Sequence, residues 1–153
     1  MADRPTVDVP RVVPEPDDLN RAFWTGGAQG QLLIQRCARC DRWVHPPQPA
    51  CPRCGGDLVA EPVSGRGTVF TFTVDLQQYH PAVPPPYVIA IVELEEQADL
   101  RIPASIVGAA IEEVDVGMAV AVEFEAHGEV HVPVFRPSTS RQSSTGRGAP
   151  DVG

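Results

Sequence analysis

The sequence predicts a mainly β protein with a short N-terminal helix, a four-cysteine segment and a small five-stranded barrel of the OB type. The four cysteines form two C-x-x-C pairs separated by ten residues. Five short segments rich in β-branched residues follow them, and turn residues divide these segments. Because no helix-length apolar pattern interrupts the five segments, a Greek-key barrel fits them well, although a β-sandwich fits the same pattern.

The 153 residues are enough for one ordinary domain or two small ones. Composition divides the chain into an extended arm (1–16), a helix plus cysteine segment (17–60), an OB-fold (61–137) and a disordered tail (138–153). Prolines without periodicity mark the arm, which we expect to be ordered only where a partner or the body holds it. Serine, glycine and arginine dominate the tail and bury little apolar surface.

The second part is expected to begin with the short helix. Asp17 and Asp18 are an acidic start typical of a helix, and Leu19 and Phe23 follow at helical spacing. The glycines after residue 25 weaken or end this helix. Phe23 and Trp24 are expected to pack against the cysteine segment; alternatively, such an aromatic pair is typical of a partner interface.

The barrel strands are predicted from alternation of apolar and polar residues. The second expected strand is almost wholly apolar, which indicates a central position, while Pro103 in the third indicates an edge strand or a bulge. The expected strands are 67–75, 87–95, 101–107, 118–125 and 131–135.

The cysteines predict a metal site. They are Cys37, Cys40, Cys51 and Cys54. Each C-x-x-C pair is able to wrap around a metal ion, and two such knuckles give a tetrahedral four-sulfur site that suits zinc. Gly55 and Asp41 follow the two pairs, where a left-handed backbone is needed. We expect one structural zinc per chain; iron would use the same ligands, so the sequence leaves it open.

Other uses of the cysteines fit less well. Disulfides are typical of exported proteins, and the first residues lack the apolar block of a signal peptide, so we expect a cytoplasmic location. A thioredoxin-like pair would need a C-x-x-C at a helix start within an α/β unit. His45 lies between the pairs and is expected to pack in its loop, because four sulfurs already complete the metal shell.

Charge and length exclude several classes of function. Twelve basic residues, all arginine, face twenty acidic ones, for a net charge of −8. An acidic chain is a poor general binder of nucleic acid, since phosphates are bound by basic surface. Without lysine, neither a Schiff base nor a lysine-tipped phosphate loop is available. No apolar run is long enough to span a membrane.

Arginines nevertheless gather around the cysteines. Arg36, Arg39, Arg42 and Arg53 lie in this segment with few acids. Two interpretations stand: the arginines offset the negative zinc–thiolate centre, or they form a positive patch for a phosphate-bearing ligand or an acidic partner.

A proline-rich segment between the first two strands carries Tyr79, His80 and Tyr87. These rings are able to line a pocket, or they pack on the barrel in a stiff connector. With the cysteines assigned to metal, the sequence shows no evident nucleophile with a base. We therefore expect no catalytic residues and no enzyme activity from this chain by itself.

The order of these features resembles that of a known family: rubredoxin-like zinc-ribbon plus OB-fold proteins first catalogued as domain of unknown function thirty-five. The resemblance covers about residues 17–137 and is specific in its combined order. It rests on Phe23–Trp24, Gly-x-Leu-Leu-x-x-x-Cys (30–37), the two knuckles (37–54), Gly-x-Gly-Thr-Val (65–69), Pro-Tyr-Val (86–88), Gly-Met-x-Val (117–120) and Pro-x-Phe-x-Pro (133–137).

The resemblance implies a non-catalytic accessory subunit that binds a thiolase-superfamily acyl-CoA enzyme, in first place a retro-aldolase of steroid side-chain CoA thioesters. An acetyl-CoA acetyltransferase is the alternative partner, and a hot-dog-fold enoyl-CoA hydratase is a further one, to which the chain would be bound or fused. A different class, a single-stranded nucleic-acid-binding module, is compatible with both folds but disfavoured by the charge.

Only the four cysteines transfer from the family by position. Contacts with the partner or with a coenzyme A thioester are expected from the aromatic helix, the basic knuckles and the proline-rich segment. These candidate residues are Phe23, Trp24, Arg39, Arg42, Arg53, Tyr79, His80 and Tyr87.

Overall fold

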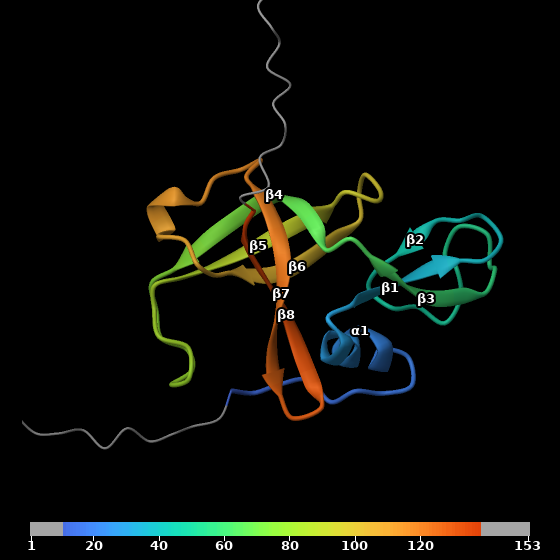
Figure 1. The fold of residues 1–153 in the computed structure, drawn as a ribbon, viewed down its shortest axis with the longest axis horizontal. Helices are drawn as coiled ribbons and strands as arrows, with labels where there is room; N and C mark the ends of the chain where they lie inside the picture. The colour runs from blue at the N-terminus through green and yellow to red at the C-terminus, as the bar shows by residue number, and fades with distance from the viewer. Residues whose placement is uncertain (1–10, 139–153) are drawn as a thin grey trace, which may run out of the picture.

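The structure, a computed structural model, describes residues 11–138, so most of the predicted arm and all but the first residue of the predicted tail lie outside the described residues. Two bodies of β structure stand next to each other: a three-stranded sheet and a closed five-stranded barrel. A short helix lies below them, beside the three-stranded sheet and the last barrel strands (Figure 1). The mainly β prediction is therefore confirmed, including the N-terminal helix and the barrel.

The helix begins later than its acidic start predicts. Helix α1 spans Arg21–Thr25 and continues as a 3-10 turn, η1 (Gly26–Gln29). Asp17 instead closes a turn before the helix, where its side chain accepts hydrogen bonds from the main-chain N–H groups of Leu19 (2.9 Å) and Asn20 (2.8 Å). Leu19, which the sequence places at helical spacing with Phe23, lies before the helix and is 44% exposed.

The three-stranded sheet contains the strands around the cysteines. Strands β1 (Leu32–Cys37), β2 (Trp43–Val44) and β3 (Leu58–Val63) pair antiparallel in the order β2-β1-β3. Alternation explains β1, because Leu32 and Ile34 are both 1% exposed while Leu33 between them is only partly buried. Strand β3 was not predicted as a separate strand. Among its side chains, that of Leu58 packs near the cysteines.

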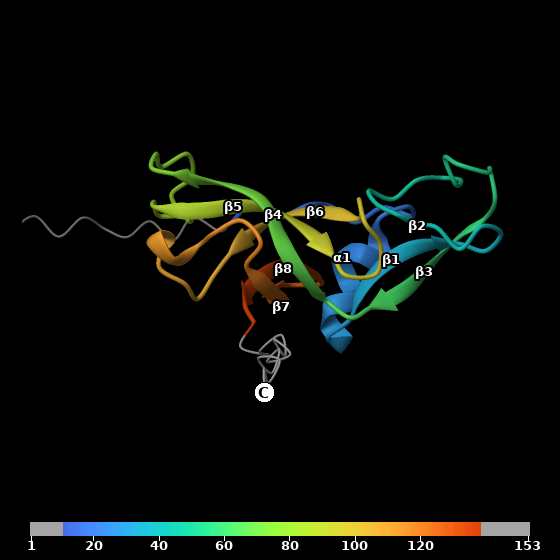
Figure 2. The same cartoon turned by 90° about the horizontal axis from the view of Figure 1, so that it is seen from above.

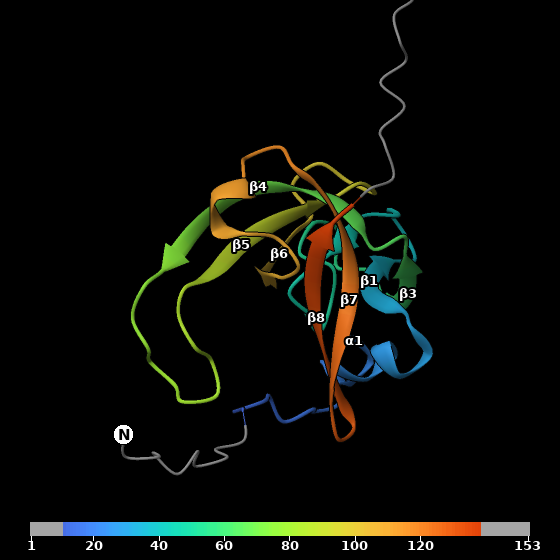
Figure 3. The same ribbon diagram turned by 60° about the vertical axis from the view of Figure 1, so that its left-hand side comes forward.

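The barrel closes in the order β4-β5-β6-β8-β7, with β6 and β8 parallel and the other pairs antiparallel. This is the strand order of an OB-fold. Figure 3 shows β4 and β5 as a long curved pair opposite the upright β7 and β8. The elements are β4 (Arg66–Asp75), β5 (Tyr87–Leu94), β6 (Arg101–Ile106), the 3-10 turn η2 (Ile111–Glu113), β7 (Ala119–His127) and β8 (Val130–Pro137).

All five predicted strands are present, and the last two extend further than predicted. Strands β7 and β8 form one hairpin whose pairing runs from His127↔Val130 to Val120↔Pro137. Gly128, with φ 66°, turns the chain between them. Residues 120–127 of β7 each pair with a residue of β8. This main-chain pairing extends both strands beyond the apolar alternation from which they were predicted.

One apolar core joins the barrel to the helix and to the three-stranded sheet. Phe135 of β8 is fully buried, at 0% exposed, and Phe23 of α1 belongs to the same cluster of buried side chains. Gly27 permits the close packing of η1 on the β7–β8 hairpin, since a Cβ there would lie 2.5 Å from the Cβ of His131. The ribbon sheet and barrel are thus one packed unit.

The β5–β6 turn also holds the three-stranded sheet. The Gln97 side chain accepts a hydrogen bond from the Trp43 main-chain N–H (2.9 Å) and donates one to the Trp43 carbonyl (3.0 Å). Arg42 and Asp99 form an ion pair of 2.7 Å beside this contact. The amide of Gln97 therefore occupies the place of a strand partner for β2.

The barrel is closed by few contacts on one side. Strand β6 pairs with β5 along its length, but with β8 only at Ile106↔Phe135. Strand β6 is therefore neither the edge strand nor the bulged strand that Pro103 suggested; the proline is tolerated because its main-chain nitrogen faces the sparsely paired side. Figure 2, from above, shows the three-stranded sheet projecting beyond the end of the barrel.

Candidate metal centre and the neighbouring groove

The two C-x-x-C pairs form equivalent knuckles. The Asp41 N–H donates to the Cys37 carbonyl (3.0 Å), and the Gly55 N–H donates to the Cys51 carbonyl (2.8 Å). Asp41 has φ 62° and Gly55 has φ 72°, so the left-handed positions predicted from the sequence are confirmed. Each knuckle reverses the chain so that both of its sulfurs face the other pair.

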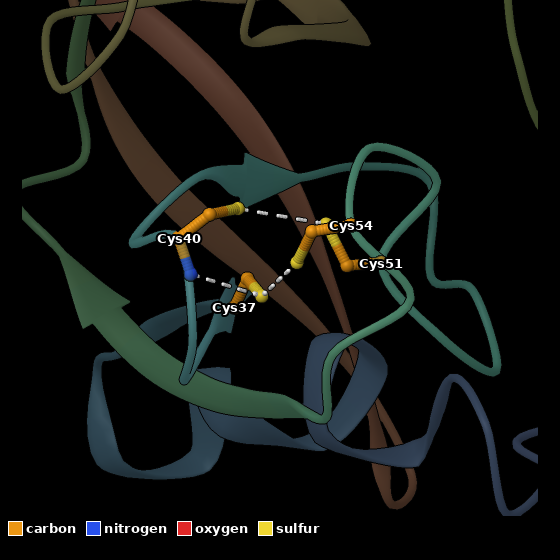
Figure 4. Close-up of side chains that lie close together, drawn as sticks. All are labelled: Cys37, Cys40, Cys51 and Cys54. Atoms are coloured by element: carbon orange, nitrogen blue, oxygen red, sulfur yellow. Dashed lines mark hydrogen bonds between the residues drawn. The ribbon is translucent and has the colours of Figure 1, made fainter.

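The four sulfurs lie close together, all within 4.8 Å of one another. The Sγ atoms of Cys37 and Cys54 are 3.4 Å apart, and those of Cys40 and Cys51 are 3.7 Å apart (Figure 4). A zinc ion with four sulfur ligands at about 2.3 Å separates them by about 3.8 Å. The cysteines therefore fit one tetrahedral metal ion, as predicted.

Main-chain donors prepare the thiols for metal. The N–H groups of Arg39 and Cys40 approach the Cys37 sulfur at 3.4 and 3.5 Å. The hydrogen bond from Cys40 is the main reason why the pKa of Cys37 falls to about 6. For Cys54, the Gly56 N–H lowers the pKa, but the neighbouring thiols and burial together outweigh it and raise the pKa to about 11. A dication relieves this repulsion among four clustered sulfurs.

Gly56 is also part of this site. A Cβ at this position would lie 2.9 Å from the Cys37 sulfur and 3.2 Å from the Cys54 sulfur. A side chain here would therefore compress the metal ligands. The signal in the sequence was the second glycine after the last cysteine, since the left-handed turn at Gly55 accounts for only the first.

The arginines of the knuckles do not act as one set. Arg42 is committed to Asp99, and Arg36 lies over the Trp43 ring with its Cζ 5.2 Å from the centroid. Arg39 and Arg53 remain at the ends of the knuckles, and within residues 11–138 neither has a carboxylate in ion-pair range. Three arginines were candidates for partner or ligand contact: Arg39, Arg42 and Arg53. Within residues 11–138, only Arg39 and Arg53 lack an ion pair with a carboxylate.

The aromatic helix meets a histidine of the cysteine segment. Phe23 is buried, contacts Trp24 edge-on at 4.7 Å between centroids, and packs on the His45 ring at 4.8 Å. Burial lowers the pKa of His45 to about 4. The expected packing role of His45 therefore agrees with its position, away from the sulfur cluster.

The candidate residues of the proline-rich segment lie far from the metal site, at the opposite end of the barrel (Figures 1 and 2). His80 accepts a hydrogen bond from the Ala82 N–H (3.1 Å), and Tyr87 donates one to Asp75 (3.0 Å). Burial and this bond raise the pKa of Tyr87. These two side chains fix the loop, whereas Tyr79 is 72% exposed.

A groove that no sequence pattern indicates opens beside α1. Its volume is about 450 Å³, and its walls come from the helix, the 45–47 loop and strands β5, β6 and β8. Ile89, Pro103 and Pro133 are among its barrel residues, and Trp24 faces them from the helix. The outer face of the second and third strands is where OB-folds bind oligonucleotides. Here the part of that face that lines the groove is mainly apolar, through Ile89 and Pro103.

Comparison with known proteins agrees with this architecture. Residues 24–60 match the family model described as "ChsH2, rubredoxin-like zinc ribbon domain", and residues 60–125 match "ChsH2, C-terminal OB-fold domain". A "DUF35 domain-containing scaffold protein" of Methanocaldococcus jannaschii is 38% identical over 101 residues, which are 61% of this chain and 67% of that protein. The chain belongs to the DUF35 family. The predicted zinc ribbon and OB-fold are thereby confirmed, with zinc as the metal of the ribbon.

Two other relatives are longer. The "Probable enoyl-CoA hydratase alpha subunit" of Thermomonospora curvata is 41% identical over 128 residues, or 82% of this chain but 40% of that protein. The "3-oxo-4,17-pregnadiene-20-carboxyl-CoA hydratase alpha subunit" of Mycobacterium tuberculosis is 39% identical over 103 residues, or 67% of this chain and 32% of that protein. The chain therefore spans well under half of these two relatives.

Solved structures show the same fold. A chain from the "Ltp2-ChsH2(DUF35) aldolase" superposes with a TM-score of 0.72 at 41% identity, covering 82% of this chain and 98% of that one. A DUF35 protein of unknown function from Sulfolobus solfataricus has a TM-score of 0.53 at 15% identity, covering 79% and 86%, and shows the fold alone. Within residues 11–138, no helix has the length and apolar character needed to cross a membrane.

Proposed function

We propose that this chain is an accessory subunit that binds and supports a thiolase-superfamily acyl-CoA enzyme, a retro-aldolase acting on steroid side-chain CoA thioesters. The observation that carries the proposal is the match to a chain of the Ltp2-ChsH2(DUF35) aldolase, which covers 98% of that chain at 41% identity. The name of that protein joins a DUF35 part to a second protein. We propose the same pairing here, with this chain as the DUF35 subunit and a second protein as the enzyme.

The chemistry of the described side chains is consistent with a non-catalytic subunit. The four cysteines form one metal site with no position left for water or substrate, which is the arrangement of a structural zinc. The sequence has no lysine. His45 and His80 are occupied by packing and by a loop hydrogen bond. In this proposal, the partner enzyme supplies the catalytic groups.

The proposed role of the zinc is structural. When bound, it supplies no reaction chemistry but cross-links the two knuckles, and the knuckles carry the 45–47 loop that forms one wall of the groove. Gln97 and Asp99 hold the same sheet against the barrel. The chain would thus present a rigid, preformed surface, which reduces the entropy cost of docking.

Contact with the coenzyme A thioester belongs to the same proposal. Arg39 and Arg53 are the candidate phosphate contacts, because the other knuckle arginines are paired with acids or stacked on Trp43. Tyr79 is the exposed candidate at the far end of the barrel.

A second partner is supported by the names of two relatives. Both longer proteins are called hydratase alpha subunits, and the chain matches only 40% and 32% of them. We infer that an enoyl-CoA hydratase part, fused or separate, would join the same assembly. A cytoplasmic location is proposed with this function.

Co-expression with a thiolase-superfamily aldolase tests the proposed function. The two proteins should co-purify, run as one species on size exclusion, and cleave the aldol CoA thioester faster than the enzyme alone. Arg53→Ala and Arg39→Ala should raise KM for the thioester without separating the proteins. If the enzyme is monodisperse and fully active alone, and the two proteins elute separately, the proposal is wrong.

A further inference from the structure

The four cysteines differ in exposure in a regular way. Cys37 and Cys51, the first of each C-x-x-C pair, are 1% and 3% exposed, whereas Cys40 and Cys54, the second of each pair, are partly exposed. Two close sulfur contacts run between the knuckles: Cys54 lies 3.4 Å from Cys37, and Cys40 lies 3.7 Å from Cys51 (Figure 4). Each contact therefore joins an accessible sulfur of one knuckle to a protected sulfur of the other.

An accessible sulfur with a second sulfur in contact is the arrangement of an oxidant-sensitive cysteine and its resolving partner. A disulfide has a sulfur–sulfur distance of about 2.05 Å, so each of the two contacts needs to shorten by less than about 2 Å. When zinc is bound, all four sulfurs are deprotonated, as metal ligation requires. Exposure then decides which sulfurs an oxidant reaches, and it favours Cys40 and Cys54.

We propose that the four-cysteine site is a peroxide-sensitive site with two closed states: the zinc-bound state, and a zinc-free state in which the disulfides Cys37–Cys54 and Cys40–Cys51 join the knuckles. The second state goes beyond the structural role of the metal and does not depend on the partner enzyme. Reduction by a thiol, followed by zinc binding, would restore the first state.

The chemistry takes place on the sulfur atoms. The thiolate of Cys54 or Cys40 attacks one oxygen of hydrogen peroxide, the O–O bond breaks, hydroxide leaves, and the sulfur becomes a sulfenic acid. The protected thiolate of the other knuckle attacks this sulfur, so that the S–S bond forms, the S–O bond breaks and a second hydroxide leaves. Each disulfide thus consumes one peroxide, which accepts two electrons from two thiolates. Two disulfides leave no thiolate ligand, and the zinc ion departs.

Pairing across the knuckles preserves the shape of the sheet. The disulfides would link the same two turns that the metal links. Main-chain hydrogen bonds, from the Asp41 N–H to the Cys37 carbonyl and from the Gly55 N–H to the Cys51 carbonyl, close each turn without using a sulfur. The 45–47 loop, which forms a wall of the groove, would stay tied at both ends. Disulfides within each C-x-x-C pair would instead leave the knuckles unlinked once zinc has left.

Hydrogen peroxide added to the zinc-loaded full chain tests the proposal. A chromophoric chelator reports zinc release, and N-ethylmaleimide blocks free thiols before digestion with trypsin and mass spectrometry without reduction. Trypsin cleaves after arginine, and Arg39, Arg42 and Arg53 place each of the four cysteines on its own peptide. We expect loss of the zinc together with two linked peptide pairs, 37 with 54 and 40 with 51. Dithiothreitol and added zinc should restore the zinc content.

Two comparisons serve as controls. In urea with chelator present, short loops close more readily, so peroxide should link the cysteines within each C-x-x-C pair. Limited proteolysis of residues 42–53 compares the zinc-bound, the oxidised and the reduced zinc-free chains. Cleavage follows local opening, so the reduced zinc-free chain should be cut about tenfold or more faster than the other two.

Several results would overturn the proposal. Links of 37 with 40 and of 51 with 54 in the folded chain would show that the contacts between knuckles do not direct pairing. Sulfinic acids in place of disulfides would show that no sulfur resolves the first oxidation. The proposal also fails if zinc stays bound at peroxide concentrations that oxidise free cysteine, or if the oxidised chain is cut as fast as the reduced zinc-free chain. The subunit role stands or falls separately, because none of these measurements uses the partner enzyme.

Discussion

Replacing Gln97 by alanine should loosen the zinc-binding sheet from the barrel. The side chain of Gln97 makes both hydrogen bonds to the Trp43 main chain, at 2.9 and 3.0 Å. A hydrogen bond contributes about 0.5–1.5 kcal/mol to stability, so losing two should cost about 1–3 kcal/mol. Trp43 is only partly buried, and water is able to replace the lost partners, which favours the lower half of this range.

Gln35 offers a matched control. Its side chain makes the same pair of bonds to the Gln48 main chain, at 2.7 and 3.1 Å, but both residues belong to the zinc-binding segment. Gln35→Ala should therefore speed zinc release while leaving the barrel unchanged. Gln97→Ala should instead lower the free energy of unfolding measured for the whole chain.

Urea unfolding with zinc in excess, followed by circular dichroism, gives the free energy of unfolding, and a chromophoric chelator reports zinc release. The reasoning is refuted if Gln97→Ala loses less than about 0.5 kcal/mol, which is below the contribution of a single bond. It is also refuted if Gln35→Ala destabilises the barrel as much as Gln97→Ala does.

Three further predictions concern the metal site and pH. Metal analysis should find one zinc per chain, and Cys51→Ser should lose most of it while the circular dichroism of the barrel persists; full zinc in Cys51→Ser would contradict the site. Gly56→Ala should retain zinc less tightly in a chelator competition, because its Cβ would lie 2.9 Å from the Cys37 sulfur, whereas Gly128→Ala, which meets no atom within 4 Å, should retain it normally. The pKa of His45 is about 4 in the folded chain against an ordinary 6.5, so the unfolded chain binds more protons between these values and stability falls as pH drops through that window. His45→Gln should therefore lose less stability than the wild type between about pH 7 and pH 5 in urea titrations; equal losses would refute this reasoning.

The metal site and the barrel were predictable because local patterns specify both. Ligand spacing and the residues after each knuckle, Asp41 and Gly55, define the metal site within one short stretch of chain. Alternation along each strand marks which residues face the core, as at Leu32 and Ile34. These signals require only neighbours in sequence.

Features that depend on distant residues were not predictable in the same way. The acidic start at Asp17 resembled a helix start, but its side chain closes a turn instead, and tertiary packing of Phe23 sets where α1 lies. The groove combines residues of the helix, the ribbon loop and the last strand, such as Trp24, Pro47 and Pro133. No sequence pattern brings those three together, and the pairing of Arg42 with Asp99 likewise needed the fold.

The packing of α1 against β8 has a consequence for synthesis on the ribosome. Arg21 of the helix contacts Glu129 of the β7–β8 turn, 108 residues later in the chain. At about 5–20 residues per second, translation separates the two by about 5–20 s. The cysteine knuckles are close in sequence and are able to bind zinc during this interval. Phe23 and Trp24 remain without their contacts to the last strand until that strand is synthesised. Chains that stop before the last strand would therefore carry metal but no groove, so only completed chains would be competent to join an assembly through that surface.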